Sequence, residues 1–138
     1  MIIDTSALIA LYNPDEHEHS AVSELIIDSN EQMIVSPLVL AELDYMIQTK
    51  FSPELAIQVM LDVAGGAFTI AHLDVADIKK AARISEKYLD TPIGLTDASL
   101  VVLAEHFEDD IILTTDFRHF SVLRNSKGKP FTLPLCNK

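Results

Sequence analysis

Short runs of apolar, largely β-branched residues alternate with longer segments of helical period along this chain, and that alternation limits the fold class. A β-branched run too short to be a helix is typical of a buried strand. Strands that are separated by helices favour an α/β fold with a mostly parallel sheet. The expected strands are residues 1–3, 33–35, 68–70 and 111–113.

The segments between these runs carry helix start signals. A serine followed by proline places a capping hydroxyl directly before the residue type that suits the first helical position. This signal occurs twice, and Asp and Thr caps precede two further helical segments. The expected helices are residues 18–29, residues 37–48 behind Ser36, residues 53 to the glycine pair 65–66 behind Ser52, residues 74–89 capped by Asp74, and one capped by Thr96 that ends near residue 106.

Length and composition indicate one globular unit. The chain has 138 residues, of which 49% are hydrophobic and 22% charged, so we expect residues 1–138 to form a single domain with a substantial core. No apolar run approaches the roughly 18–20 residues of a membrane span, and the first residues lack the basic region of a signal peptide. The single cysteine, Cys136, excludes a disulfide framework within one chain. We therefore expect a cytoplasmic protein with no membrane partner.

Charge is distributed unevenly along the chain. The net charge is −11, yet residues 1–116 hold all 21 acids with five Lys or Arg, whereas residues 117–138 hold five bases and no acid. A strongly acidic protein binds a polyanion poorly unless cations are gathered locally. The basic tail, which ends at Lys138, is the candidate contact for a polyanion; the alternative interpretation is a solvated tail.

Four acids stand where a parallel sheet collects ligands. Ligands of such sheets bind beyond the carboxyl ends of the strands. Asp4 directly follows the first expected strand, and Asp116 follows the last by two threonines. Asp97 lies in the first turn of an expected helix, and Glu42 lies within the apolar run 38–43, where burial of a carboxylate is costly unless a positive group meets it.

Converging carboxylates without His or Cys suit Mg²⁺ or Mn²⁺ better than Zn²⁺. A divalent ion acts as a Lewis acid and lowers the pKa of bound water, which are the two tasks of phosphodiester hydrolysis. Taken singly, each acid also has a structural interpretation: Asp4 as a helix cap, Asp97 as a first-turn acid, Asp116 as a turn residue and Glu42 as a surface residue.

The same acids carry a family resemblance. Residues 2–8 (IIDTSAL) resemble the opening of the PIN-domain nucleases. The family pattern continues with a Glu in an early helix, matched at 41–43 (AEL), and an Asp that opens a later helix, matched at 95–100 (LTDASL). It closes with Thr-x-Asp-x-x-Phe, matched at 114–120 (TTDFRHF). The order, the spacing and the total length agree, and the compact form is most similar to the VapC toxins of toxin–antitoxin pairs.

This resemblance implies a three-layer α/β/α fold and a Mg²⁺- or Mn²⁺-dependent endoribonuclease that cuts structured RNA, such as tRNA or a ribosomal RNA loop. It also implies a homodimer and a VapB-like antitoxin partner. The implied metal-binding and catalytic residues are Asp4, Asp97 and Asp116, with Glu42 completing the acidic pocket. Three hydroxyl residues would hydrogen-bond these carboxylates, and five residues after Asp116 are possible RNA contacts. The hydroxyl residues are Thr5, Ser6 and Thr114, and the possible RNA contacts are Arg118, His119, Arg124, Lys127 and Lys129.

Other interpretations remain open or fail on single positions. A haloacid-type phosphatase would need an Asp where Ser6 stands. No receiver-type Lys follows the last expected strand, and no P-loop is present. A non-catalytic member of the same fold, whose acidic pocket receives a basic partner segment, stays open. Residues 16–19 (EHEH) could hold a metal but lack companion ligands, so a solvated helix start is favoured. An apolar stripe, Leu55, Val59, Met60 and Val63, is either core or a surface for a partner.

Overall fold

A parallel four-stranded sheet forms the centre of the fold. In this computed structural model, which describes residues 1–136, the strand order is β3-β2-β1-β4 and every neighbouring pair is parallel. Ile3 of β1 pairs with Val35 of β2 and with Leu113 of β4, so these three strands end at the same level. The expected parallel sheet is confirmed, with each strand two residues long. The strands are β1 Ile2–Ile3, β2 Ile34–Val35, β3 Thr69–Ile70 and β4 Ile112–Leu113.

Seven helices are present in residues 1–136, and five of them, α2 to α6, follow the expected segments. Helix α1, which Asp4 alone separates from β1, and the short α7, which directly follows Asp116, were not among the expected helices. The helices are α1 Thr5–Tyr12, α2 His19–Asp28, α3 Pro37–Lys50, α4 Pro53–Val63, α5 Val75–Glu86, α6 Leu95–His106 and α7 Phe117–Phe120.

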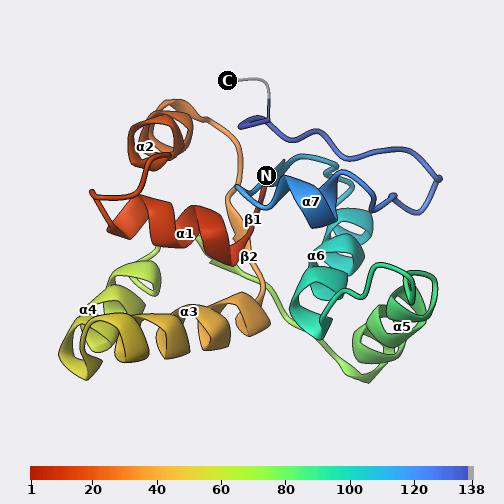
Figure 1. The fold of residues 1–138 in the computed structure, drawn as a ribbon, viewed down its shortest axis with the longest axis horizontal. Helices are drawn as coiled ribbons and strands as arrows, with labels where there is room; N and C mark the ends of the chain where they lie inside the picture. The colour runs from red at the N-terminus through yellow and green to blue at the C-terminus, as the bar shows by residue number, and fades with distance from the viewer. Residues whose placement is uncertain (137–138) are drawn as a thin grey trace.

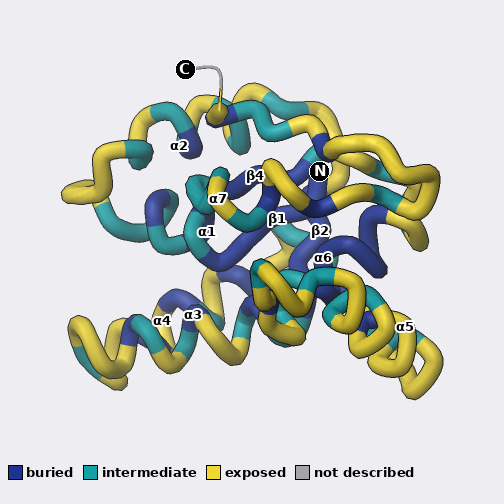
Figure 2. The backbone as a smooth tube through the Cα atoms, turned by 45° about the vertical axis from the view of Figure 1, so that its right-hand side comes forward, coloured by how far each residue is buried: buried dark blue, intermediate teal, exposed yellow. Residues whose placement is uncertain are grey.

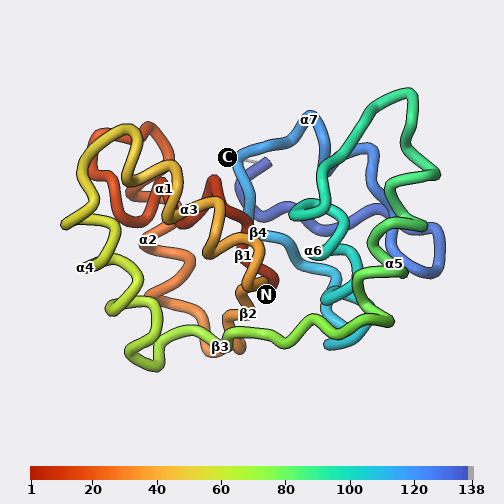
Figure 3. Tube along the Cα trace, turned by 90° about the horizontal axis from the view of Figure 1, so that it is seen from below, coloured from red at the N-terminus to blue at the C-terminus, as the bar shows by residue number. Residues whose placement is uncertain are grey.

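The helices cover both sides of the sheet, which gives the expected α/β/α layers. Helices α1 to α4 lie to one side of the strands and α5 and α6 to the other (Figures 1 and 3). Burial is concentrated in the strands and in α6, while α4 and α5 present much of their length to solvent (Figure 2). Seven consecutive residues of α6, Ala98 to Ala104, are buried. Helix α6 is therefore a rigid core element that begins beside the carboxyl ends of the strands.

Side-chain caps fix the starts of three helices as the sequence predicts. Ser36 accepts a hydrogen bond from the Leu38 N–H, and Ser52 caps α4 in the same manner. Asp74 forms a reciprocal capping box with Asp77.

The expected cap at Thr96 is wrong. Gly94 is the N-cap of α6, with an extended backbone, and Thr96 is the second helical residue. The carbonyl of Thr96 instead accepts a hydrogen bond from Ser99. Because the helix begins two residues earlier than expected, Asp97 is its third residue and stays within the first turn.

The apolar stripe of α4 is divided between core and surface. Val59 and Val63 are buried, whereas Leu55 is 37% exposed and lines a pocket with Tyr12 and Phe51. Within the described part of the chain, no helix is long and apolar enough to cross a membrane.

Residues 16–19 form a solvated start to α2, as favoured. The side chain of His17 is almost fully exposed. The Nδ1 of His19 instead lies 2.7 Å from the carbonyl oxygen of Ala10, which ties α2 to α1. Within residues 1–136, this segment contributes no group of ligands close enough to hold a metal.

Candidate active site

The sheet places Asp4 and Asp116 at the same edge, beyond the carboxyl ends of β1 and β4. Asp4 follows β1 and Asp116 lies three residues beyond β4. The backbone N–H of Asp4 donates to the carbonyl of Leu113 at 3.0 Å, which extends the β1–β4 pairing by one step. Asp4 and Thr114 are thereby neighbours at the carboxyl edge of the sheet.

A network of hydroxyl groups holds the carboxylate of Asp4. Thr114 Oγ1 donates to Asp4 Oδ2 at 2.7 Å, and Ser6 Oγ donates to the same oxygen at 2.9 Å. The two hydroxyl oxygens in turn accept backbone N–H groups, Ser6 from Thr115 at 3.0 Å and Thr114 from Asp116 at 2.9 Å. The network therefore fixes the path of the chain from β4 to Asp116 relative to Asp4.

Thr5 does not make the expected side-chain hydrogen bond. Its Oγ1 is buried and has no hydrogen-bond partner within residues 1–136. Successive helical residues point roughly 100° apart, so Thr5, at the start of α1, turns into the interior while Ser6 reaches Asp4. The backbone of Thr5 interacts with the Asp4 carboxylate instead and lowers its pKa.

Three side chains converge above this network. Asp97, Asp116 and His119 each offer a ligand atom, and these atoms lie within 4.8 Å of one another. Both carboxylate oxygens of Asp116 are held by His119, Oδ2 lying 2.8 Å from the ring Nδ1 and Oδ1 accepting the backbone N–H at 3.2 Å. His119 was expected as a nucleic-acid contact; here its ring belongs to the acidic cluster. The three-residue spacing of Asp116 and His119, one helical turn, is the sequence signal that could have indicated this.

Burial and mutual repulsion raise the pKa of two acids. The pKa of Asp4 is raised because burial disfavours its charged form, and the hydroxyl groups of Thr114 and Ser6 oppose that shift. The pKa of Asp97 is raised to about 6. Burial is the largest cause, the negative charges of Asp4 and Asp116 add to it, and His119 lowers the pKa. Carboxylates that repel one another in this manner gain from a cation placed between them. The donor set therefore fits a divalent metal ion.

Glu42 lies at the edge of this centre. The buried face of α3 consists of Val39, Leu43 and Ile47, and the helical period turns Glu42 away from that face into an exposed position. Its charge makes the smallest of the contributions that raise the pKa of Asp97. The carboxylate therefore bears no burial cost, because the run is amphipathic at this point.

A directed chain of hydrogen bonds joins the first turns of α3 and α6. Ser99 Oγ donates to the Thr96 carbonyl at 2.6 Å and lies 2.9 Å from Ser36 Oγ. A carbonyl only accepts, so the Ser99 proton is taken and Ser36 donates to Ser99. Ser36 accepts in turn from the Leu38 N–H at 3.2 Å. The chain holds the first turn of α6, and with it Asp97, against the start of α3.

The basic tail packs against the domain through its apolar residues, while most of its basic side chains are exposed. Phe131 and Leu135 are buried, and Thr132 pairs with Ile111 beside the sheet. Arg118 is exposed on α7, and Nη1 of Arg124 donates to two backbone carbonyls at 2.9 Å. The remaining residues of this set, Lys127 and Lys129, are exposed on a turn that Asn125 stabilises, and Lys138 lies outside the described residues.

Comparison with known proteins identifies the family. The PIN-domain family model matches residues 1–125. The chain is 47% identical to Ribonuclease VapC26 of Mycobacterium tuberculosis over 133 residues, which is 96% of this chain and 98% of that protein. Its fold is similar to that of VapC20, a sarcin-ricin-loop-cleaving toxin of M. tuberculosis, with a TM-score of 0.78 at 15% identity over 84% of this chain and 89% of the other. It is also similar to the DNA-bound VapBC of Salmonella typhimurium, with a TM-score of 0.68 at 19% identity over 96% of each chain. The chain therefore belongs to the PIN-domain family and, within it, to the VapC ribonucleases.

Proposed function

We propose that residues 1–138 act as a single PIN domain that hydrolyses RNA with Mg²⁺ or Mn²⁺ and serves as the toxin of a toxin–antitoxin pair. The observation that carries this proposal is that one ligand atom each of Asp97, Asp116 and His119 lies within 4.8 Å of the other two. The raised pKa of Asp97, about 6, supports a centre built for a cation.

The side chains divide the work of such a site. A bound divalent ion would supply Lewis acidity and a water of lowered pKa. Asp97 and Asp116 would hold the ion, with His119 fixing Asp116 or adding a nitrogen ligand. Asp4, held by two hydroxyl groups, would add negative charge to the metal-binding centre. Glu42 would complete the acidic pocket from the solvent side.

The Asp97 carboxylate is the group most available to a ligand. Within residues 1–136 no hydrogen bond of 3.5 Å or less reaches its oxygens, whereas Asp4 and Asp116 are each held by two or more bonds. A carboxylate that is part-buried and unpaired has a desolvation cost that a cation offsets. For this reason Asp97 is the position at which substitution should disable the centre most cleanly.

Partners and substrate follow from the relatives. Similar structures include VapBC assemblies and a toxin that cleaves the sarcin-ricin loop, so we propose a VapB-like antitoxin, a homodimer and a structured RNA target, either tRNA or a ribosomal RNA loop. Exposed apolar side chains support a protein partner. Tyr45 and Leu61 are each 69% exposed on α3 and α4, two helices that pack together, and exposed apolar groups are available to a partner.

Cleavage of total cellular RNA by partner-free protein tests the proposal. Wild type should give discrete fragments with Mg²⁺ or Mn²⁺ and none with EDTA. Asp97→Asn should give none under any condition, whereas Asp90→Asn, which changes an exposed loop carboxylate by the same chemistry, should cleave as wild type does. Mapping the fragment ends would name the target.

The alternative is a non-catalytic module whose acidic pocket receives a basic segment. Under this alternative, folded wild type gives no RNA fragments with either metal. Calorimetric titration with Mn²⁺ also shows no binding. Mn²⁺ binding that Asp97→Asn abolishes, without cleavage of bulk RNA, would instead indicate a nuclease whose target is absent from the sample.

A further inference from the structure

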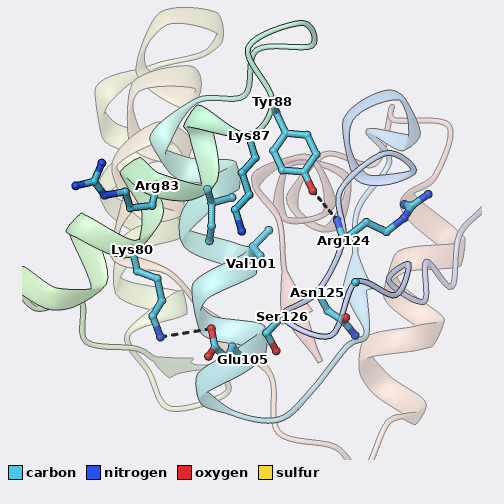
Figure 4. Close-up of a pocket in the computed structure, with 11 residues that line it drawn as sticks. Lys80, Arg83, Lys87, Tyr88, Val101, Glu105, Arg124, Asn125 and Ser126 are labelled. Atoms are coloured by element: carbon cyan, nitrogen blue, oxygen red, sulfur yellow. Dashed lines mark hydrogen bonds and ion pairs between the residues drawn. The ribbon is translucent and has the colours of Figure 1, made fainter.

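The fold assembles a groove lined by basic residues from two distant parts of the sequence. A cavity of about 410 Å³ lies between α5, α6 and residues 124–128. Lys80, Arg83 and Lys87 line it from α5 and its end, and Arg124 lies on the opposite wall (Figure 4). Four of the ten Lys and Arg residues of an acidic chain thus border one cavity, with Glu105 as the single acid in its lining.

The sequence could not reveal this grouping. Residues before 117 hold only five Lys or Arg, and three of those five line this groove. Their spacing of three and four residues places them on one face of α5. The tail, which alone looked basic, supplies the other wall.

The three cations of α5 and its end lack strong internal pairs, whereas the Arg124 guanidinium donates to two backbone carbonyls. Lys80 Nζ lies 3.4 Å from Glu105, and both side chains are about half exposed. Arg83 pairs with Glu86 on its own helix, where both side chains are largely exposed. Exposed pairs of this kind contribute little free energy, so an incoming anion can replace them. Lys87 has no acid within 4.0 Å among residues 1–136.

Hydrogen bonds hold the two walls in place. The Tyr88 hydroxyl accepts the backbone N–H of Arg124 at 3.0 Å, which links the end of α5 to the tail across the groove. Asn125 Oδ1 accepts two backbone N–H groups of the turn that follows, and Gly128 turns the chain with φ of +77°. The groove is thus a built feature rather than a gap beside a loose loop.

Two walls of the groove lie on segments that also carry or follow acids of the centre. Helix α6 carries Asp97 in its first turn, and Val101 and Glu105, one and two turns later, line the groove. The opposite wall follows Asp116 by way of α7. Helices α5 and α6 run antiparallel, because residues 87–94 join them at one end while Lys80 meets Glu105 at the other. Lys87 therefore lies at the end of the groove nearer to Asp97.

We propose that this groove binds phosphate groups of the RNA backbone next to the bond that the acidic centre cleaves. The inference rests on the proposed ribonuclease function and adds a second binding region to it. An acidic centre repels phosphates, and a group of cations whose Lys87 end is the nearer to Asp97 offsets that repulsion. The ligand chemistry is a run of phosphodiesters rather than a base, because the lining offers charge and few groups that could read base edges.

Salt dependence of RNA binding tests the groove without relying on cleavage. The probe is a short fluorescein-labelled single-stranded RNA, titrated with metal-free, partner-free protein at several NaCl concentrations. Arg83→Gln/Lys87→Gln removes two groove cations. Lys50→Gln/Lys79→Gln removes the same charge outside the groove, since neither residue lines it.

The expected result is a slope of log K against log [NaCl] that is shallower by about 1.4 for the groove variant, because each single-strand phosphate contact contributes about 0.7. The control should keep the wild-type slope, and Arg83→Lys/Lys87→Arg should restore it. Melting curves establish that the variants fold.

Equal slopes for the groove variant and the control would overturn the proposal. So would a groove variant that loses binding of a polyglutamate peptide while its RNA slope is unchanged, because the groove would then serve an acidic protein segment. A failure of the proposed ribonuclease function is distinguishable from this result. In that case wild type does not cleave cellular RNA, whatever the salt dependence of RNA binding is.

Discussion

Thr114 donates a 2.7 Å hydrogen bond to the buried carboxylate of Asp4 across 110 residues of sequence. The same hydroxyl oxygen accepts the backbone N–H of Asp116 at 2.9 Å. One side chain thus connects two of the four site acids and sets their relative position.

Replacing Thr114 by Val should loosen the centre while preserving the shape of the core. Thr114 is fully buried, so the loss leaves polar groups short of partners and should cost about 1–3 kcal/mol in urea unfolding. Mn²⁺ affinity measured by calorimetry should fall by roughly 10–100-fold, as is typical when a partner of a ligand is removed. Thr114→Ser keeps the hydroxyl and should retain most of the affinity. Unchanged affinity in Thr114→Val would show that Asp4 does not need this bond.

Asp97 should make the metal-free protein less stable as pH rises. Its folded-state pKa is raised from 3.8 to about 6, so between these values the folded state holds a proton that the unfolded state has released, and stability is lost with rising pH. Asp97→Asn should therefore melt at a higher temperature than wild type above pH 6, with the difference vanishing below pH 3.8.

Melting temperature measured against pH in EDTA, with Asp90→Asn as the matched control, tests this expectation. A constant difference between Asp97→Asn and wild type across the whole range would contradict it. Addition of Mn²⁺ should reverse the order, because wild type gains a bound ion and the Asn variant does not.

His119 should act on metal binding through Asp116. Its ring and its backbone N–H together hold both carboxylate oxygens of Asp116. His119→Ala removes the ring contact and should weaken Mn²⁺ binding by roughly tenfold or more, with little effect on the free energy of unfolding because the side chain is part-exposed. Arg118→Ala, one residue away and exposed, is the control. If both variants bind Mn²⁺ as wild type does, His119 is not part of the centre.

Ser99→Ala should release the first turn of α6 from α3. The buried Ser36 hydroxyl would lose its acceptor and the Thr96 carbonyl its donor, at a cost of about 1–3 kcal/mol. Urea unfolding of Ser99→Ala, Ser36→Ala and the double variant measures this as a coupling energy. Additive losses would mean that the two hydroxyl groups act independently. Ser20→Ala, on the exposed part of α2, should change nothing.

Periodicity and capping residues predicted most of the fold because they are local signals. Each strand begins one residue later than expected and ends where expected, and Ser36, Ser52 and Asp74 cap the helices as expected. Thr96 misled because glycine with an extended backbone also begins a helix, and no side-chain signal marks that choice. Helix α7 has four residues, which are too few to show a helical period in the sequence.

The site was predictable in its acids and not in its contacts. Strand ends placed Asp4 and Asp116, but which hydroxyl reaches Asp4 depends on helical phase, so Ser6 makes that bond and Thr5 does not. The basic groove depends on α5 lying beside the tail, which is a tertiary relationship. Lys87 and Arg124 are far apart in the sequence and line the same cavity only in the folded chain.

The pairing of β1 with β4 has a consequence for synthesis. The chain emerges from the ribosome N-terminus first, so Ile2 and Ile3 must wait for Ile112 and Leu113 before the centre of the sheet is complete. Asp4 likewise meets Thr114 and Asp116 only when nearly all of the chain has been made. A nascent or truncated polypeptide that stops short of Asp116 thus carries three of the acids without the centre that joins them. Such a chain also lacks His119, so it cannot bring together the ligand atoms of Asp97, Asp116 and His119.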